Sequence, residues 1–353
     1  MNLPMPKAKT FKRIAWGSVL GLLLVVSVFG LIIYKRLFSP NLLVGKKSEL
    51  YLYIPTGSKF DDVVAILNKG KLLKDEESFR WTACEMKYDK NVKPGRYLLK
   101  EHMNNKDLIA LLRSGNQTPL DVVFNNIRTK EQLAEKVGSQ LEATPSSILN
   151  LLNDPDYTKE LGFTPESILS MFIPNTYEMY WNTSADKFIR KMKKEYDKFW
   201  TADRINRARK RELTPLQISI IASIVQLETN KPDEKSIVAG VYVNRFKKDW
   251  KLEADPTLVY ALGDFSVSRV LNVYKEIDSP YNTYMYKGLP PGPICLPTIE
   301  SLDAVLNYME HDFMYFCAKD DFSGYHAFAS TYSKHIENAH RFQRALDKRG
   351  IKS

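Results

Sequence analysis

The first feature of the hydrophobic pattern is a long apolar run near the N-terminus. Residues 14–34 are 21 consecutive residues without a charge, and a helix needs about 20 apolar residues to cross a bilayer. The run ends at Tyr34-Lys35-Arg36, whereas a signal peptide has a shorter apolar region and ends at small residues. The pattern therefore favours an uncleaved membrane anchor.

The charges around this run predict its orientation. Four basic residues precede it, and only Lys35 and Arg36 follow it closely, so the positive-inside rule places the N-terminus in the cytoplasm. We accordingly predict a cytoplasmic tail (residues 1–13), a single transmembrane helix (14–34) and a stalk (35–47). The rest of the chain is then expected outside the cytoplasmic membrane.

Short strand and helix patterns alternate beyond the predicted stalk. Residues 50–54 predict a strand, and the helix that follows is expected to end at Gly70. A second strand at 97–99 is followed by a helix that is expected to end at Gly115, and a third strand is expected at 122–124. Such units are typical of a compact α+β module, and by themselves they indicate no ligand.

Helical patterns dominate the rest of the chain. Residues 145–210 are predicted mostly as helix, with an interruption at Pro174, and residues 213–347 combine helices with loops that contain Gly and Pro. Near the C-terminus, 314–318 and 325–329 predict the two strands of a hairpin. The fold class expected from this order is α+β.

One helix in this region has clear boundaries and a buried character. Thr214 is suited to the N-cap, Pro215 to the first helical position, and Gln217 completes a capping box. The helix must end before Pro232, because the residue before a proline disfavours helical dihedral angles. Between these limits nearly all residues are apolar, which predicts a helix buried on most sides.

Glu228 stands apart from the polar residues of this helix. Four polar side chains share one stripe: Ser219, Ser223, Gln226 and Asn230. At about 100° per residue, Glu228 lies on the opposite side. Poor solvation and the helix dipole in the last turn both raise the pKa of such a carboxyl, as a proton donor requires. Pairing with a cation such as Arg245 would instead lower the pKa, and the residues alone leave both possibilities open.

Charge and cysteine content narrow the function classes. The net charge of +10 suits anionic surfaces such as phospholipid headgroups or cell-wall polymers, although several of the cations simply flank the apolar run. The three cysteines show no short spacing, so no disulfide framework or zinc ribbon is indicated. The histidines lack a His-Glu-x-x-His spacing and no Gly-rich phosphate loop is present, so we expect neither a metal nor a cofactor. Acidic residues within the basic segment 187–198 argue against nucleic acid.

Seven segments resemble, in order, the motifs of one known family, the YceG-like (MltG-type) endolytic murein transglycosylases. These segments are 172–177 (FIPNTY), 222–229 (ASIVQLET), 238–245 (VAGVYVNR), 252–257 (LEADPT), 281–284 (YNTY), 288–294 (GLPPGPI) and 324–328 (GYHAF). The likeness spans nearly the whole chain. It differs in two places: the family commonly has Glu where this chain has Gln226 and often has Asp where it has Asn175, so we assign neither residue a catalytic role.

The resemblance implies an organisation and an activity. It implies a LysM-like module that holds peptidoglycan (residues 48–117), a connecting region (118–212) and an α+β catalytic domain (213–350). Glu228 matches the family's catalytic glutamate, which acts first as a general acid toward the leaving oxygen and then as a base toward the sugar's C6 hydroxyl. The implied reaction cuts MurNAc-GlcNAc bonds within glycan strands and leaves 1,6-anhydroMurNAc ends.

Supporting residues and alternatives complete the expectation. Six residues are candidates for binding sugar hydroxyl and acetamido groups, although core packing and turn formation would explain about half of them equally well: Asp255, Tyr281, Asn282, Thr283, Tyr284 and His326. One alternative is a non-catalytic, membrane-anchored scaffold that binds peptidoglycan. Another is a muramidase, a hydrolase that uses Glu228 and Asp255 as its two carboxylates. The expected partners are peptidoglycan strands, the membrane and peptidoglycan synthases.

Overall fold

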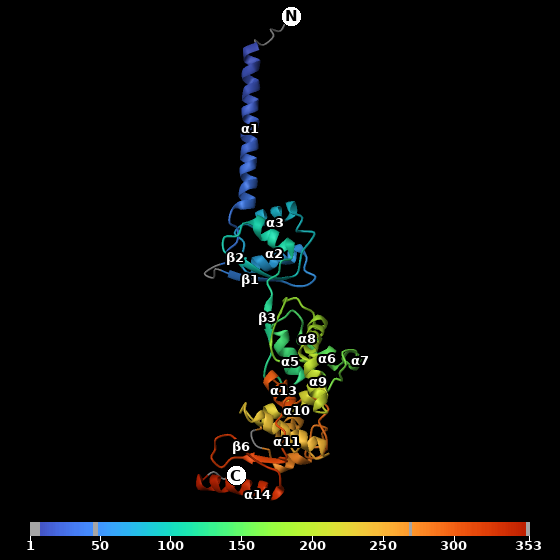
Figure 1. Ribbon diagram of the computed structural model, residues 1–353. Coiled ribbons are helices and arrows are strands. Elements are labelled where there is room, and N and C mark those ends of the chain that lie inside the picture. The colour runs from blue at the N-terminus through green and yellow to red at the C-terminus, as the bar shows by residue number, and fades with distance from the viewer. Residues whose placement is uncertain (1–7, 45–48, 268–269, 351–353) are drawn as a thin grey trace. The chain divides into compact units, whose positions relative to one another are not determined.

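The structure, a computed structural model, describes residues 8–44, 49–267 and 270–350 (Figure 1). These residues form two compact units. The first takes the chain up to Leu120 together with Glu178–Asn182, and the second takes Asp121–Tyr177 and the chain from Thr183 onward. Residues 1–7 of the expected tail and 45–47 of the expected stalk lie outside the described residues. The segment boundaries expected from the resemblance remain predictions.

The first helix, α1 (Ala8–Phe38), contains the predicted anchor. Its segment Ala15–Phe38 has a mean hydropathy of 2.4 over 24 residues and is, by length and composition, able to cross a membrane. The side chains of this segment are almost all exposed in the isolated chain. A single N-terminal apolar helix of this kind fits a single-pass membrane anchor.

The described residues of the expected stalk are attached to the first unit. The helix continues to Phe38, and the Arg36 carbonyl accepts a hydrogen bond of 2.8 Å from the Asn105 side chain. Leu42 and Val44 then lie in the core of the first unit, with 1% and 8% of their surface exposed. Burial of these two apolar side chains fixes the segment to the module, so it is not an extended spacer.

The first unit is a two-stranded antiparallel sheet covered by three helices. Its elements after α1 are β1 (Glu49–Ile54), α2 (Phe60–Lys69), α3 (Glu76–Glu85), β2 (Gly95–Lys100) and α4 (Asn105–Ser114). The register pairs Leu52 with Tyr97 and Ile54 with Gly95. Leu52, Ile54 and Tyr97 point into the core, because side chains alternate between the two faces of a strand. Helix α3 is an addition to the predicted strand–helix pairs.

The second unit is mostly helical. Its elements are β3 (Leu120–Val123), α5 (Lys130–Gly138), α6 (Pro145–Asn153), α7 (Pro155–Glu160), η1 (Ile168–Met171), β4 (Thr176–Met179), α8 (Ala185–Phe199), α9 (Ala202–Lys210), α10 (Pro215–Glu228), α11 (Lys235–Lys247), α12 (Asp255–Leu262), η2 (Asn272–Glu276), α13 (Ile299–Leu306), β5 (Tyr315–Ala318), β6 (His326–Ala329) and α14 (Tyr332–Lys348). Strands β3 and β4 pair, and the chain passes between the two units along them. The predicted hairpin is confirmed as the antiparallel pair β5–β6. The mixed α+β class is confirmed as well, whereas β4 follows Pro174 where only an interruption was expected.

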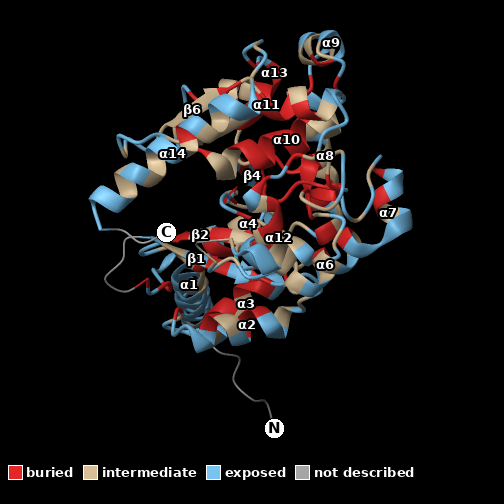
Figure 2. Cartoon of the chain, turned by 90° about the horizontal axis from the view of Figure 1, so that it is seen from below, coloured by how far each residue is buried: buried red, intermediate tan, exposed pale blue. Residues whose placement is uncertain are grey.

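Helix α10 lies in the core of the second unit, and its residues 218–225 are buried (Figure 2). Thr214 and Gln217 form the predicted capping box, and the helix ends at Glu228. Of the polar stripe, Ser219 and Ser223 are buried and Gln226 is half-buried, whereas Asn230 lies beyond the helix and is exposed. The Ser223 hydroxyl accepts a hydrogen bond from the Ile294 amide at 3.0 Å, and the Gln226 carbonyl oxygen accepts one from the Thr298 amide at 2.6 Å. These bonds hold the loop that contains Ile294 and Thr298 against the helix.

Candidate active site

Glu228 lines a cavity of about 280 Å³ in the second unit. Its walls come from the end of α10, from α11, from the segment that leads into α12, and from the hairpin and α14. The lining residues are Glu228, Tyr242, Arg245, Leu252, Glu253, Asp255, Tyr284, Tyr315, Phe316, Tyr332 and His335. Segments from several parts of the second unit, together with Tyr284 from the loop at 281–284, therefore meet at this cavity.

A second hollow, of about 530 Å³, is lined by two of the same acidic residues. It shares Glu228 and Asp255 with the first cavity, and apolar side chains form most of its remaining wall: Leu227, Pro256, Val259, Phe265, Val267 and Val270, together with Arg128. The two hollows thus meet at Glu228 and Asp255. An extended ligand that occupies both would pass directly over this pair.

The local sequence explains why the Glu228 carboxyl faces the cavity. Thr229 adopts an extended conformation (φ −140°, ψ 138°) and ends α10, so Glu228 occupies the last helical position. The Tyr242 hydroxyl donates a hydrogen bond of 2.6 Å to Glu228 Oε1. Oε2 has no hydrogen-bond partner among the described residues, and it is therefore the oxygen available to a ligand.

The environment of Glu228 favours its protonated form. Burial is the main cause and raises the pKa of Glu228 to about 7, and the negative charge of Asp255 acts in the same direction. The hydrogen bond from Tyr242 and, more weakly, the positive charge of Arg245 lower the same pKa. The residues alone left a raised and a lowered pKa both open, and the folded environment favours the raised one. A carboxyl with a pKa near 7 can both donate and accept a proton at neutral pH.

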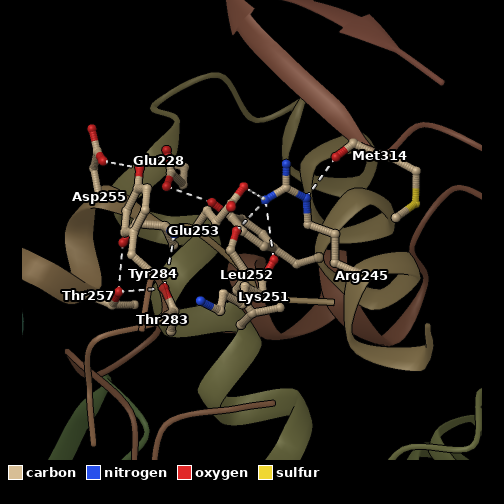
Figure 3. Close-up of polar contacts among 12 residues, drawn as sticks. Glu228, Arg245, Lys251, Leu252, Glu253, Asp255, Thr257, Thr283, Tyr284 and Met314 are labelled. Carbon is tan, nitrogen blue, oxygen red and sulfur yellow. Dashed lines mark hydrogen bonds and ion pairs between the residues drawn. The ribbon is translucent and has the colours of Figure 1, made fainter. Parts of the chain in front are cut away.

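Arg245 does not neutralise Glu228 by direct pairing. Its Nε donates to the Met314 carbonyl at 2.7 Å, and its Nη1 donates to the Leu252 carbonyl at 2.7 Å and to Glu253 Oε2 at 3.1 Å (Figure 3). These bonds join α11 to β5 and to the loop before α12. The pairing considered in the sequence analysis is therefore replaced by a structural role of Arg245 in the cavity wall.

Asp255 is the second carboxylate at the junction of the two hollows. It is the first residue of α12, and the Tyr284 hydroxyl donates a hydrogen bond of 2.6 Å to its Oδ1 (Figure 3). Burial and the neighbouring Asp255 both raise the pKa of Tyr284, so the phenol remains a donor. Of the six predicted supporting residues, the structure brings Asp255 and Tyr284 together with Glu228.

The side chains of Asn282 and Thr283, two of the predicted sugar contacts, are buried, and their polar atoms form hydrogen bonds within the protein. The Asn282 amide donates to the carbonyls of Lys275 and Ile277, at 2.9 and 2.8 Å. The Thr283 hydroxyl accepts from the Ala254 amide at 3.0 Å. These bonds hold the 281–284 loop beside α12 and so position Tyr284.

Tyr281 and His326 also lie away from the cavity that contains Glu228. Tyr281 packs against Tyr260, with ring centroids 4.6 Å apart. His326 lies on β6, where its Nδ1 is 2.9 Å from Glu234 Oε2 in a different hollow of the surface. Direct contact of either residue with a sugar at Glu228 is not supported by this arrangement.

The structure adds residues that the sequence analysis missed. Tyr242 and Arg245 are one turn apart on α11 and share a face. This spacing could have indicated from the sequence that the two side chains lie together. Tyr315, Tyr332 and His335 reach the cavity from β5 and α14. No local sequence pattern predicts this placement. Burial and the charge of Arg245 lower the pKa of His335, which keeps this ring neutral.

Among the described residues no group of three His, Cys, Asp or Glu side chains could hold a metal ion.

Comparison with known proteins places the chain in a family. A sequence profile of the YceG-like family matches residues 52–341. The chain belongs to the YceG-like family. The motif resemblance noted from the sequence is thereby confirmed.

Two named bacterial proteins and one crystal structure are similar to this YceG-like protein. It is 27% identical over 305 residues to the "Endolytic murein transglycosylase" of Bacillus subtilis (strain 168), covering 82% of this chain and 83% of that protein. It is 26% identical over 334 residues to a protein of the same name from Streptococcus pneumoniae (strain D39), covering 85% of this chain but 60% of that protein. A crystal structure described as a putative yceG-like protein from Listeria monocytogenes matches 83% of this chain and 99% of that one, at 27% identity and a TM-score of 0.55.

Proposed function

We propose that this YceG-like protein is an endolytic murein transglycosylase, a lyase that cuts MurNAc-GlcNAc bonds within peptidoglycan glycan strands. The observation that carries the proposal is the protonatable Glu228 carboxyl at the junction of two hollows. An enzyme that cuts inside a strand must bind sugars on both sides of the broken bond, and the two hollows offer that space. The printed names of the relatives support the same activity.

The proposed mechanism uses Glu228 twice. Its Oε2 proton is transferred to the glycosidic oxygen as the bond from C1 of MurNAc to that oxygen breaks, and positive charge develops at C1. The C6 hydroxyl of the same sugar then attacks C1, and its proton returns to the Glu228 carboxylate. The products are a 1,6-anhydroMurNAc end and a free GlcNAc hydroxyl, and no water is consumed.

Tyr242 has a positioning role in this proposal. Because its hydroxyl binds Oε1 at 2.6 Å, the transferable proton is confined to Oε2, the oxygen that has no hydrogen-bond partner among the described residues. The same bond partly offsets the effect of burial on the pKa. Tyr242 is almost fully buried, so we propose no contact between its ring and the substrate.

Asp255 is proposed to orient the sugar and to stabilise the positive charge at C1. A hydrogen bond from Tyr284 holds the Asp255 carboxylate at the meeting point of both hollows. The muramidase alternative differs in that Asp255 would activate water or attack C1 itself. The two reactions give products that differ by one water.

Product analysis tests the proposed function. Purified peptidoglycan is digested with the full chain, and the released fragments are examined by mass spectrometry. We expect internal cuts with 1,6-anhydroMurNAc ends. Reducing MurNAc ends would identify a hydrolase, and no release at all by a folded chain would support the non-catalytic scaffold.

Replacement of Asp255 by Asn tests the division of roles. The negative charge of Asp255 raises the pKa of Glu228, so Asp255→Asn is expected to move the alkaline limb of the pH profile of kcat/KM to lower pH. We expect a partial loss of rate, about 10- to 100-fold, since one electrostatic contact to the transition state is removed. A near-total loss of activity would instead make Asp255 a second catalytic carboxylate.

The finer localisation and the role of the first unit are also part of the proposal. We propose that the N-terminus is cytoplasmic and that both units lie outside the cytoplasmic membrane, next to their substrate. We also propose that the first unit is a LysM-like module that holds glycan strands. Peptidoglycan synthases are the partners proposed for an enzyme that controls strand length.

A further inference from the structure

The outward face of the β1–β2 sheet carries exposed aromatic side chains. Along β1, Tyr51 and Tyr53 are 38% and 42% exposed, whereas Leu52 and Ile54 between and beyond them are buried. The two tyrosines lie on the same face, about 7 Å apart along the strand. Two neighbouring aromatic rings that stay partly exposed on one face of a sheet form a candidate binding surface.

A residue from a distant part of the chain completes this face. Trp181 belongs to the segment Glu178–Asn182, which returns to the first unit. Its ring packs edge-on against Tyr53, with centroids 5.0 Å apart and an interplanar angle of 70°. The Asn182 side chain bonds to the Pro94 carbonyl at 3.4 Å and so attaches the segment next to β2. The face therefore has three aromatic rings in fixed positions.

Arg96 adds a cation to the same face. It pairs with Tyr53 in the sheet register, and its guanidinium lies 3.5 Å from the centroid of the Tyr51 ring. Its Nη1 donates to the Pro119 carbonyl at 2.6 Å. Two independent contacts thus hold the guanidinium, which reduces the conformational entropy lost when an anion binds.

The charge distribution of the unit matches a neutral or anionic ligand. Four acidic residues lie in the first turns of α2 and α3: Asp61, Asp62, Glu76 and Glu77. On the sheet face Arg96 and Lys100 are cationic, and the one acidic residue of the two strands, Glu49, lies opposite Lys100 at the end of the register. An anionic ligand would meet little repulsion on the aromatic part of the face.

We propose that Tyr51, Tyr53, Trp181 and Arg96 form a binding surface for peptidoglycan glycan strands. The apolar faces of the sugar rings stack on the aromatic rings, the phenol hydroxyls bind sugar hydroxyls, and the guanidinium binds a carboxylate of the lactyl or peptide substituents. This inference rests on the proposed function, since it takes peptidoglycan as the substrate. It identifies a second contact with the strand, separate from the cavity at Glu228.

The surface has a consequence for the boundaries of the module. A fragment of residues 48–117 contains Tyr51, Tyr53 and Arg96 but not Trp181. Such a fragment would have an incomplete surface. The full chain is therefore the appropriate protein for the test.

The test compares binding in the absence of cleavage. The full chain with Glu228→Gln is reconstituted in phospholipid nanodiscs and sedimented with insoluble peptidoglycan, with and without Tyr51→Ser, Tyr53→Ser and Trp181→Ser. We expect the three added substitutions to weaken binding about tenfold or more, since three stacking contacts are lost. Tyr286→Ser, which removes a 45% exposed tyrosine of the second unit, is the matched control and should leave binding unchanged.

Two outcomes would overturn the inference. Unchanged binding of the triple variant, with an unchanged unfolding midpoint, would show that the face does not hold the strand. Quenching of Trp181 fluorescence by brominated lipid, measured against Trp181→Phe, would show that the face lies on the bilayer. Failure of the proposed function is separate: the unsubstituted chain would release no fragments even where the sheet face binds peptidoglycan.

Discussion

Glu228→Gln is expected to lower the rate of glycan cleavage by at least the upper part of the range of about 10²–10⁴-fold that general acid–base catalysis supplies. The amide keeps the size of the side chain and can still accept the hydrogen bond from Tyr242, but it has no transferable proton. Glu228 is the acid of the first step and the base of the second step in the proposed reaction, so the substitution removes the proton-transfer group from both steps. Binding of peptidoglycan should survive.

The same variant supplies its own control for folding. The pKa of Glu228 is raised to about 7 in the folded chain, above its value in an unfolded chain, so the native state binds more protons and its stability falls as pH rises between these two values. Gln does not titrate. The unfolding midpoint of Glu228→Gln should therefore exceed that of the unsubstituted chain by more at about pH 8 than at about pH 5.

A carboxyl outside the cavity gives the matched comparison for activity. Glu212 is exposed and pairs with Lys247 at 2.7 Å, so Glu212→Gln should leave cleavage unchanged. Release of fragments is followed by mass spectrometry for both variants. If Glu228→Gln cuts at the rate of the unsubstituted chain, another residue is the acid.

Tyr242→Phe is the second substitution with a large expected effect. It removes the donor to Glu228 Oε1 and leaves the ring in place, so packing is conserved. A hydrogen bond to a charged group is worth about 1.5–3 kcal/mol, which corresponds to about 10- to 100-fold in rate if the bond is needed in the transition state. We expect a loss of this size in kcat at neutral pH, with a smaller change in KM.

The pH profile separates this positioning role from a purely structural one. The hydrogen bond from Tyr242 lowers the pKa of Glu228, so its removal should raise the pKa further and move the alkaline limb of kcat/KM to higher pH. This shift is opposite in sign to the one expected for Asp255→Asn. A lower rate with an unmoved limb would leave Tyr242 with a role in packing alone.

Several features of this protein follow from local sequence because their causes are local. The anchor depends on the length of one apolar run, and α10 depends on a capping box and a continuous apolar pattern, so both were predictable from residues close together in the chain. The position of Glu228 away from the polar stripe was predictable for the same reason, because it follows from helical periodicity, whereas the residues alone left the direction of its pKa shift open. Seven short motifs also sufficed to indicate the YceG-like family.

Other features depend on contacts between residues that are distant in sequence. The buried state of Asn282, the attachment of residues 41–44 to the module and the return of Trp181 to the first unit have no local signal. The family motif predicted that residues 281–284 belong to the functional site. It did not predict which of these side chains reach the cavity. That choice depends on which polar atoms the surrounding backbone already satisfies, and only the folded chain brings those partners together.

The active-site environment shows the same division most clearly. The sequence by itself determined that a carboxyl lies near the end of a mostly apolar helix, away from the polar stripe of that helix. The tertiary structure decided that Tyr242 takes Oε1, that Arg245 bonds to backbone carbonyls instead of to Glu228, and that Asp255 shares the junction of two hollows. Helix periodicity fixes the direction in which a side chain points, whereas the partner it meets there is fixed by the packing of other elements against that face.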